Sequence, residues 1–174
     1  MKKKILLFLI SFFILFQFNS SANDKIVFID INYIFKNSDA GKDLYNQISK
    51  KNDQLQNEIN KFKNQIEDER KKIISQKNVL SVEEYNKQIN SLEAKITKIN
   101  STVSVKKKEF ALFQKKVENN FSNSLNLLLE EYSSNNSIDI ILKRENLLMA
   151  KKDLDITQVI FKLFNDKITK IELK

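Results

Sequence analysis

The stretch from Lys42 to Tyr132 contains neither glycine nor proline, and this absence constrains the chain more than any other feature. Since these two residues are the usual helix breakers, nothing here obliges the backbone to leave the helical conformation. Apolar residues recur at alternating steps of three and four, which is the pattern of a heptad seam. The first seam comprises Tyr45, Asn52, Ile59, Ile66, Ile73, Ile48, Leu55, Phe62 and Glu69, and the second comprises Tyr85, Leu92, Ile99, Lys106, Phe113, Ile89, Ile96, Val103, Phe110 and Val117. Such narrow seams predict long helices that each bury one edge against a single neighbour.

The two seams are not in phase, and a helix start signal lies between them. Ser81 and Glu84 match a capping box, in which each side chain accepts a hydrogen bond from the other residue's backbone amide. The chain is therefore expected to reverse within residues 76–81 and to form an antiparallel coiled-coil hairpin over residues 42–116. One continuous helix is the alternative interpretation.

The segments on either side of the hairpin, residues 23–41 and 117–174, predict a small β-rich body. Strands are expected at Lys25–Asp30 and Ile138–Leu142, with Leu147–Ala150 returning as a hairpin partner, and a last helix follows Asp155. The apolar body residues singled out are Ile26, Phe28, Ile138, Ile140, Leu142 and Leu148. Because so small a core supplies only about 3–5 kcal/mol, the body is expected to oligomerise. The predicted fold class is α+β, mostly α.

The N-terminus has the pattern of a secretory signal. Lys2, Lys3 and Lys4 form a cationic region, residues 5–18 are almost entirely apolar, and small residues lead up to Ala22. Cleavage after Ala22 would export the mature chain to the periplasm. An uncleaved anchor is the alternative, although the apolar run is shorter than the roughly 20 residues that span a bilayer.

Enzyme chemistry finds little support in the composition. The chain has no His and no Cys, which removes the commonest nucleophiles, bases and zinc ligands. Gly41 is the only glycine, and Gly41-Lys42 is followed by Asp43, so the phosphate-binding loop pattern fails. No catalytic residue, cofactor or metal is expected. Within NSDAGKDL, Asn37 or Ser38 is expected to cap the first long helix, and Gly41 to allow a close approach or an unusual backbone angle.

Charged and apolar residues of the hairpin suggest a binding surface. A reversal near residue 78 would bring several lysines together as a basic collar: Lys50, Lys51, Lys106, Lys107 and Lys108. It would also set residues 70–72, Arg-Lys-Lys, opposite Glu83 and Glu84. Apolar residues mark the hairpin tip, and polar residues that interrupt the seam are expected to make it flexible: Ile74, Val79 and Leu80 at the tip, Asn52, Glu69 and Lys106 in the seam. Acidic protein segments or lipid phosphates are the expected partners, and an ordinary solvated helix surface is the alternative.

Two longer segments resemble the OmpH/Skp family of periplasmic chaperones. KIVFIDINYIFKNSDAGKDL, which includes Ser38, Gly41 and Lys42, is similar to that family's opening strand and start of the first long helix, and IDIILKRENLLMAKKDLDITQVIFKLFN is similar to its closing segment. The resemblance implies a homotrimer in which helical tentacles enclose a cavity that holds unfolded outer-membrane proteins without ATP. It also implies a possible contact with lipopolysaccharide. An exported coiled-coil spacer or adaptor is the competing class, and a nucleic-acid binder would require the signal sequence to be a misreading.

Overall fold

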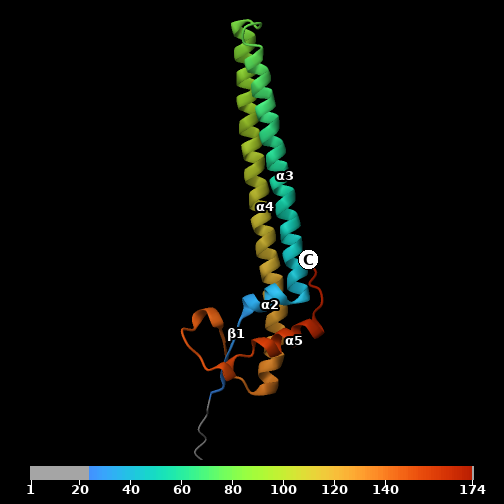
Figure 1. The fold of residues 1–174 in the computed structure, drawn as a ribbon, viewed down its shortest axis with the longest axis vertical. Helices are drawn as coiled ribbons and strands as arrows, with labels where there is room; N and C mark the ends of the chain where they lie inside the picture. Colours follow the sequence, from blue (N-terminus) through green and yellow to red (C-terminus); the bar gives the residue numbers. More distant parts are fainter. Residues whose placement is uncertain (1–23, 174) are drawn as a thin grey trace, which may run out of the picture.

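The computed structural model describes residues 24–173, and the predicted signal sequence, residues 1–22, lies outside the described residues. The elements are β1 (Ile26–Ile29), α2 (Ile31–Asn37), α3 (Asp39–Ser75), α4 (Val82–Asn136), β2 (Ile140–Lys143), the 3-10 turns η1 (Arg144–Asn146) and η2 (Lys152–Leu154), and α5 (Thr157–Lys167). Figure 1 shows α3 and α4 side by side and antiparallel, as a long hairpin that rises from a small body made by the other elements. The predicted mostly helical α+β fold is confirmed. Within residues 24–173, no helix is both long and apolar enough to cross a bilayer.

The hairpin reverses where the sequence places the helix start signal. Residues 76–80 continue the hydrogen bonding of α3 in helix-like turns beyond Ser75, with the Leu80 amide donating to the Gln76 carbonyl at 3.0 Å. The capping box follows, because the Glu84 amide donates to the Ser81 hydroxyl oxygen at 3.2 Å and the Ser81 amide donates to the Glu84 carboxylate at 3.1 Å. These bonds from Ser81 hold the pKa of the Glu84 carboxyl below its ordinary value. The predicted capping box is therefore present in both halves.

The sheet is smaller than expected. Strands β1 and β2 pair in parallel, with Ile26 beside Ile140, as their connection through the whole hairpin permits. The other edge of β1 is bridged by Asp155, which pairs with Phe28. The expectation that Leu147–Ala150 returns as a third strand is wrong, since the chain leaves β2 through η1 and this segment joins no strand.

The core lies in the body, at the end of α4 that lies beyond α3. Buried apolar residues from five elements meet there: Val27 and Ile29 of β1, Ile34 of α2, Leu44 of α3, Phe121, Leu125 and Leu128 of α4, and Ile160 and Phe164 of α5. The Phe121 ring contacts Phe35 at a centroid distance of 5.0 Å and Phe164 at 5.4 Å. The hairpin seam enters this core through Leu44, whereas Tyr45, placed in the seam by the sequence pattern, is 62% exposed.

The junction between body and hairpin is built on Gly41. Ser38 is the N-cap of α3, and its hydroxyl oxygen accepts from the Gly41 amide at 3.1 Å. Gly41 does not have a positive φ. It is required for close approach, because a Cβ at this position would lie 1.9 Å from the carbonyl oxygen of Phe35 at the end of α2. Of the two roles expected from the sequence, the structure selects close packing of α2 on α3.

Replacing Gly41 with Ala is expected to lower the free energy of unfolding by about 3 kcal/mol or more, because the backbone of α2 must move to admit the methyl group. Urea unfolding followed by circular dichroism measures the change. Lys42→Ala is the matched control, since this exposed neighbour should change the value by no more than about 0.5 kcal/mol. Equal stability of the two variants would contradict the close-packing role.

Candidate functional site

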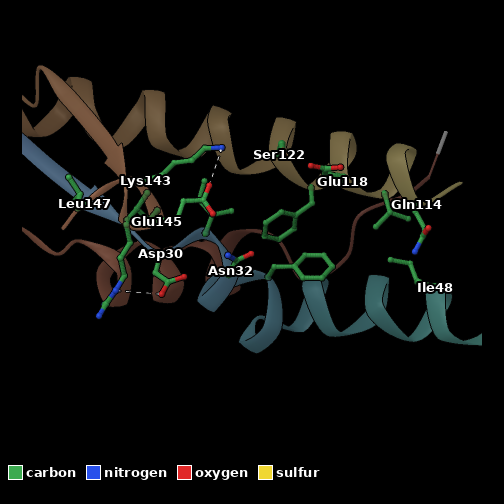
Figure 2. A pocket seen from close by; sticks show the side chains of 15 residues that line it. Asp30, Asn32, Ile48, Gln114, Glu118, Ser122, Lys143, Glu145 and Leu147 are labelled. Atoms are coloured by element: carbon green, nitrogen blue, oxygen red, sulfur yellow. Dashed lines mark ion pairs between the residues drawn. The ribbon is translucent and has the colours of Figure 1, made fainter. Parts of the chain in front are cut away.

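A groove lies between the body and the base of the hairpin, where β1, α2, α3, α4 and η1 approach one another (Figure 2). Its volume is about 690 Å³. Phe35, Ile48 and Phe121 give it an apolar floor, and charged side chains line one end. The sequence did not predict this groove, because its walls come from segments more than a hundred residues apart.

The charged groups beside the groove serve the fold. Arg144 lies 3.9 Å from the Asp30 carboxylate and 3.5 Å from that of Asp155. Asp30 also accepts from the Tyr33 amide at 2.8 Å, and Asp155 accepts from the Thr157 amide at 2.9 Å. Each carboxylate therefore accepts a backbone hydrogen bond at the start of a helix, and both lie near the guanidinium of Arg144. Among residues 24–173, no group of three or more acidic side chains is placed to hold a metal ion.

The residues predicted for the oligomerisation body divide into two sets. Phe28 and Ile138 are buried within the chain itself, at 7% and 9% exposure. Ile26, Ile140 and Leu142 share the outer face of the sheet and are 37–44% exposed. Leu148 stands fully in solvent, and beside it Met149, which the sequence reasoning did not select, is 91% exposed. These exposed apolar residues of the sheet and of the segment that follows η1 are together called the sheet-face patch: Ile26, Ile140, Leu142, Leu148 and Met149.

The predicted basic collar does not form as one cluster. Lys106 pairs with Glu58 across the hairpin at 2.6 Å, and this carboxylate raises the pKa of the lysine above its ordinary value. Lys51 lies over the Phe113 ring at 4.8 Å. Lys106 therefore lies level with a residue seven positions beyond Lys51, or about 10 Å farther along the axis. The other predicted lysines, Lys50, Lys107 and Lys108, are exposed.

The register of the hairpin differs from the predicted one because the chain reverses later. The pairs Glu58–Lys106, Lys51–Phe113 and Glu69–Lys95 all have their midpoint at residue 82, where the prediction assumed residue 78. Residues 76–80 extend α3 by helix-like turns and so delay the reversal. The predicted register would also have placed lysines opposite lysines, which the observed one avoids.

One further electrostatic prediction for the hairpin is wrong, and two predicted interruptions of the seam form ion pairs. The basic residues 70–72 do not meet Glu83 and Glu84: Lys71 pairs with Glu67 one turn away on the same helix, at 2.9 Å, and Glu84 bonds Ser81. This bond to Lys71 also lowers the pKa of Glu67. Glu69 and Lys106 do not simply interrupt the seam, because each bonds an opposite charge on the facing helix.

Exposed apolar residues mark the hairpin in two places. At the tip, Ile74 and Val79 are 57% and 84% exposed, while Leu80 is half-buried. Val82, at the first turn of α4, is 79% exposed and was missed because it belongs to no seam. Farther along α4, Val105 and Leu112 are also exposed. Their positions outside the heptad rows were the signal that could have identified them.

Comparison with known proteins gives a family match and matches to solved structures. The profile of a family described as Outer membrane protein (OmpH-like) matches residues 25–164. A crystal structure described as a candidate outer membrane chaperone (OmpH-like) from Caulobacter crescentus CB15 superposes with a TM-score of 0.76 at 17% sequence identity, over 86% of this chain and 88% of that one. None of the curated proteins compared with the chain matches it. At this identity, the solved structure shows that the two chains share a fold.

The Glu69–Lys95 pair is expected to help set the hairpin register. In a double-mutant cycle, Glu69→Lys and Lys95→Glu should each lower the free energy of unfolding, and the combined variant should recover part of the loss. The coupling should be about 0.5 kcal/mol, because both side chains are partly exposed and screened by solvent. Urea unfolding at low and high salt measures it, and the coupling should shrink as salt rises.

Glu67→Lys is the matched control for this cycle, since Glu67 pairs within its own helix and not with Lys95. Its combination with Lys95→Glu should show additive effects. If Glu69→Lys and Lys95→Glu are additive as well, the pair does not contribute to the register.

Proposed function

The chain belongs to the OmpH-like outer membrane protein family, and from this membership we propose that it is an ATP-independent holdase chaperone of the periplasm. Its clients are unfolded outer-membrane β-barrel proteins, which it binds and keeps from aggregating. The observation that carries the proposal is the long hairpin, which extends far from the core and carries exposed cationic and apolar side chains. Such a surface offers many weak contacts.

The packing of the hairpin supports a role in holding chains of variable shape. Between Leu55 and Ile73 on α3, and between Leu92 and Val117 on α4, every seam residue is only partly buried. A two-helix seam of this kind gains little packing energy per residue, so it can bend or splay at low cost. Contacts that need no single geometry suit a client that has none.

Nothing in the described part of the chain points to ATP-dependent activity, which is consistent with a holdase. Gly41, which with Lys42 resembles part of a phosphate loop, is buried in the contact between α2 and the first turn of α3. The carboxylates beside the groove are engaged by Arg144 and by helix starts. We therefore propose a binding function without catalysis, cofactor or nucleic-acid partner.

The sheet-face patch supports assembly into a homotrimer, the state implied by the family. On the outer face of the sheet, Ile26, Ile140 and Leu142 are partly exposed although Phe28 on the same face is buried, and Leu148 and Met149 are exposed in the segment after η1. Exposed apolar surface of this kind marks interaction sites in soluble proteins. In this arrangement, three copies bury their patches against one another, and three hairpins enclose the client cavity.

The proposal predicts that residues 23–174, once purified, are trimeric and keep a urea-diluted outer-membrane β-barrel protein soluble. Light scattering of the client measures aggregation, and size exclusion with multi-angle scattering measures the mass of the chaperone. A monomer without holdase activity would overturn the proposal. An oligomer without holdase activity would instead indicate a structural spacer of the envelope.

Leu148→Asp with Met149→Asp should convert the trimer to monomers, because charged side chains cannot be buried at the shared surface without a large desolvation cost. Holdase activity should fall with the mass. Val82→Asp, a similarly exposed apolar residue at the far tip, is the matched control and should leave the mass unchanged. A variant that stays trimeric with both patch residues charged would exclude this surface as the interface.

A further inference from the structure

The side of α4 that faces away from α3 carries an exposed row of alternating apolar and cationic residues. The row consists of Val105, Lys108, Leu112 and Lys115, which follow one another at steps of three, four and three and so share one helix face. Val105 is 53% exposed and Leu112 is 58% exposed. We call this row the α4 ridge.

The contacts of α4 with α3 place the ridge on the outer side of the hairpin. Lys106 and Phe113 turn towards α3, since one pairs with Glu58 and the other lies beneath Lys51. Lys108 and Lys115, two residues farther along from each of these, point about 160–200° away around the helix at 100° per residue. Val105 and Leu112 therefore have no role in the seam that explains their apolar character.

The lysines of the ridge are free of ion pairs in the described part of the chain. Within residues 24–173, Lys108 and Lys115 take part in no ion pair, whereas Lys106, on the inner side, does. The acidic residues in this part of α4 are Glu109, which follows Lys108 directly, and Glu118, which follows Lys115 by three positions. The ridge thus presents two unpaired lysines beside two exposed apolar side chains, with one carboxylate at a neighbouring position of each lysine.

We propose that the α4 ridge is a docking surface for acidic, partly apolar segments of an unfolded polypeptide. This rests on the proposed chaperone function and assigns part of its client contact to the outer side of α4. The lysines attract carboxylates over about 8–10 Å at physiological salt. Val105 and Leu112 then offer short-range contact to the apolar side chains between those carboxylates.

An unfolded chain fits the ridge better than a lipid surface does. Helices that lie on a membrane bury a wide and continuous apolar face. Here the two apolar side chains are seven residues, or about 10.5 Å, apart, with lysines between and beside them. A flexible peptide can place one apolar side chain at each point and its carboxylates at the lysines.

Binding of a fluorescently labelled unfolded peptide, rich in Asp, Glu and Leu, tests the ridge on the purified chain. Fluorescence anisotropy should show that Lys108→Glu/Lys115→Glu weakens binding at least about fivefold at low salt, and less at high salt. Val105→Ser/Leu112→Ser should weaken it at both salt concentrations. The controls are Lys61→Glu/Lys63→Glu, the same charge change on exposed lysines of α3, and Leu127→Ser at the body end of α4, where the side chain is 69% exposed.

Each ridge variant is compared with the unaltered chain by its circular dichroism spectrum and its mass, and only variants that match in both are used in the binding comparison. Ridge variants that bind the peptide as tightly as the unaltered chain would overturn the ridge, while the holdase assay of the unaltered chain judges the chaperone proposal separately. The last experiment measures the binding of the unaltered chain and of the ridge variants to vesicles containing anionic phospholipid. If the ridge variants lose vesicle binding but keep peptide binding, the surface recognises lipid and the inference is overturned.

Discussion

The burial of the C-terminal half of α4 in the body is the constraint on which the whole structure depends. Two helices packed edge to edge cannot surround any side chain, and the hairpin consequently has only a few buried residues along its length. Phe121, Leu125 and Leu128 lie beside and beyond the first turns of α3, where β1, α2 and α5 join α3 in covering them. Since one continuous helix belongs to both regions, the core that fixes this end of α4 also fixes the direction of the hairpin.

Gly41 is the second point at which body and hairpin are tied together. The end of α2 packs so closely on the first turn of α3 that no side chain fits between them. Ser38 caps α3 from within this contact and is fully buried. Both hairpin helices are therefore anchored in the core at the base of the hairpin, whereas most seam residues farther from the body are only partly buried.

Local signals in the sequence were sufficient for much of the fold. The missing helix breakers, the capping box at Ser81 and the short apolar runs of β1 and β2 depend on neighbouring residues only, and each has the expected structure. The register failed because helix-like turns after Ser75 shift it by several residues, which heptad counting cannot detect. The prediction of a third strand at residues 147–150 was wrong. Arg144, just before this segment, meets Asp30 and Asp155, and such contacts between distant segments leave no local pattern in the sequence.

For the candidate surfaces too, local sequence patterns predicted some features and missed others. Strand alternation in the sequence placed Ile138, Ile140 and Leu142 on one face, and of these Ile140 and Leu142 are partly exposed whereas Ile138 is buried in the core. Val105 and Leu112 lie outside both heptad rows, which is a signal that the sequence reasoning passed over. The Glu58–Lys106 pair places Lys106 on the inner side of α4, so Val105 and Leu112 lie away from the seam. This ion pair across the hairpin engages Lys106, whereas Lys108 takes part in no ion pair among the described residues.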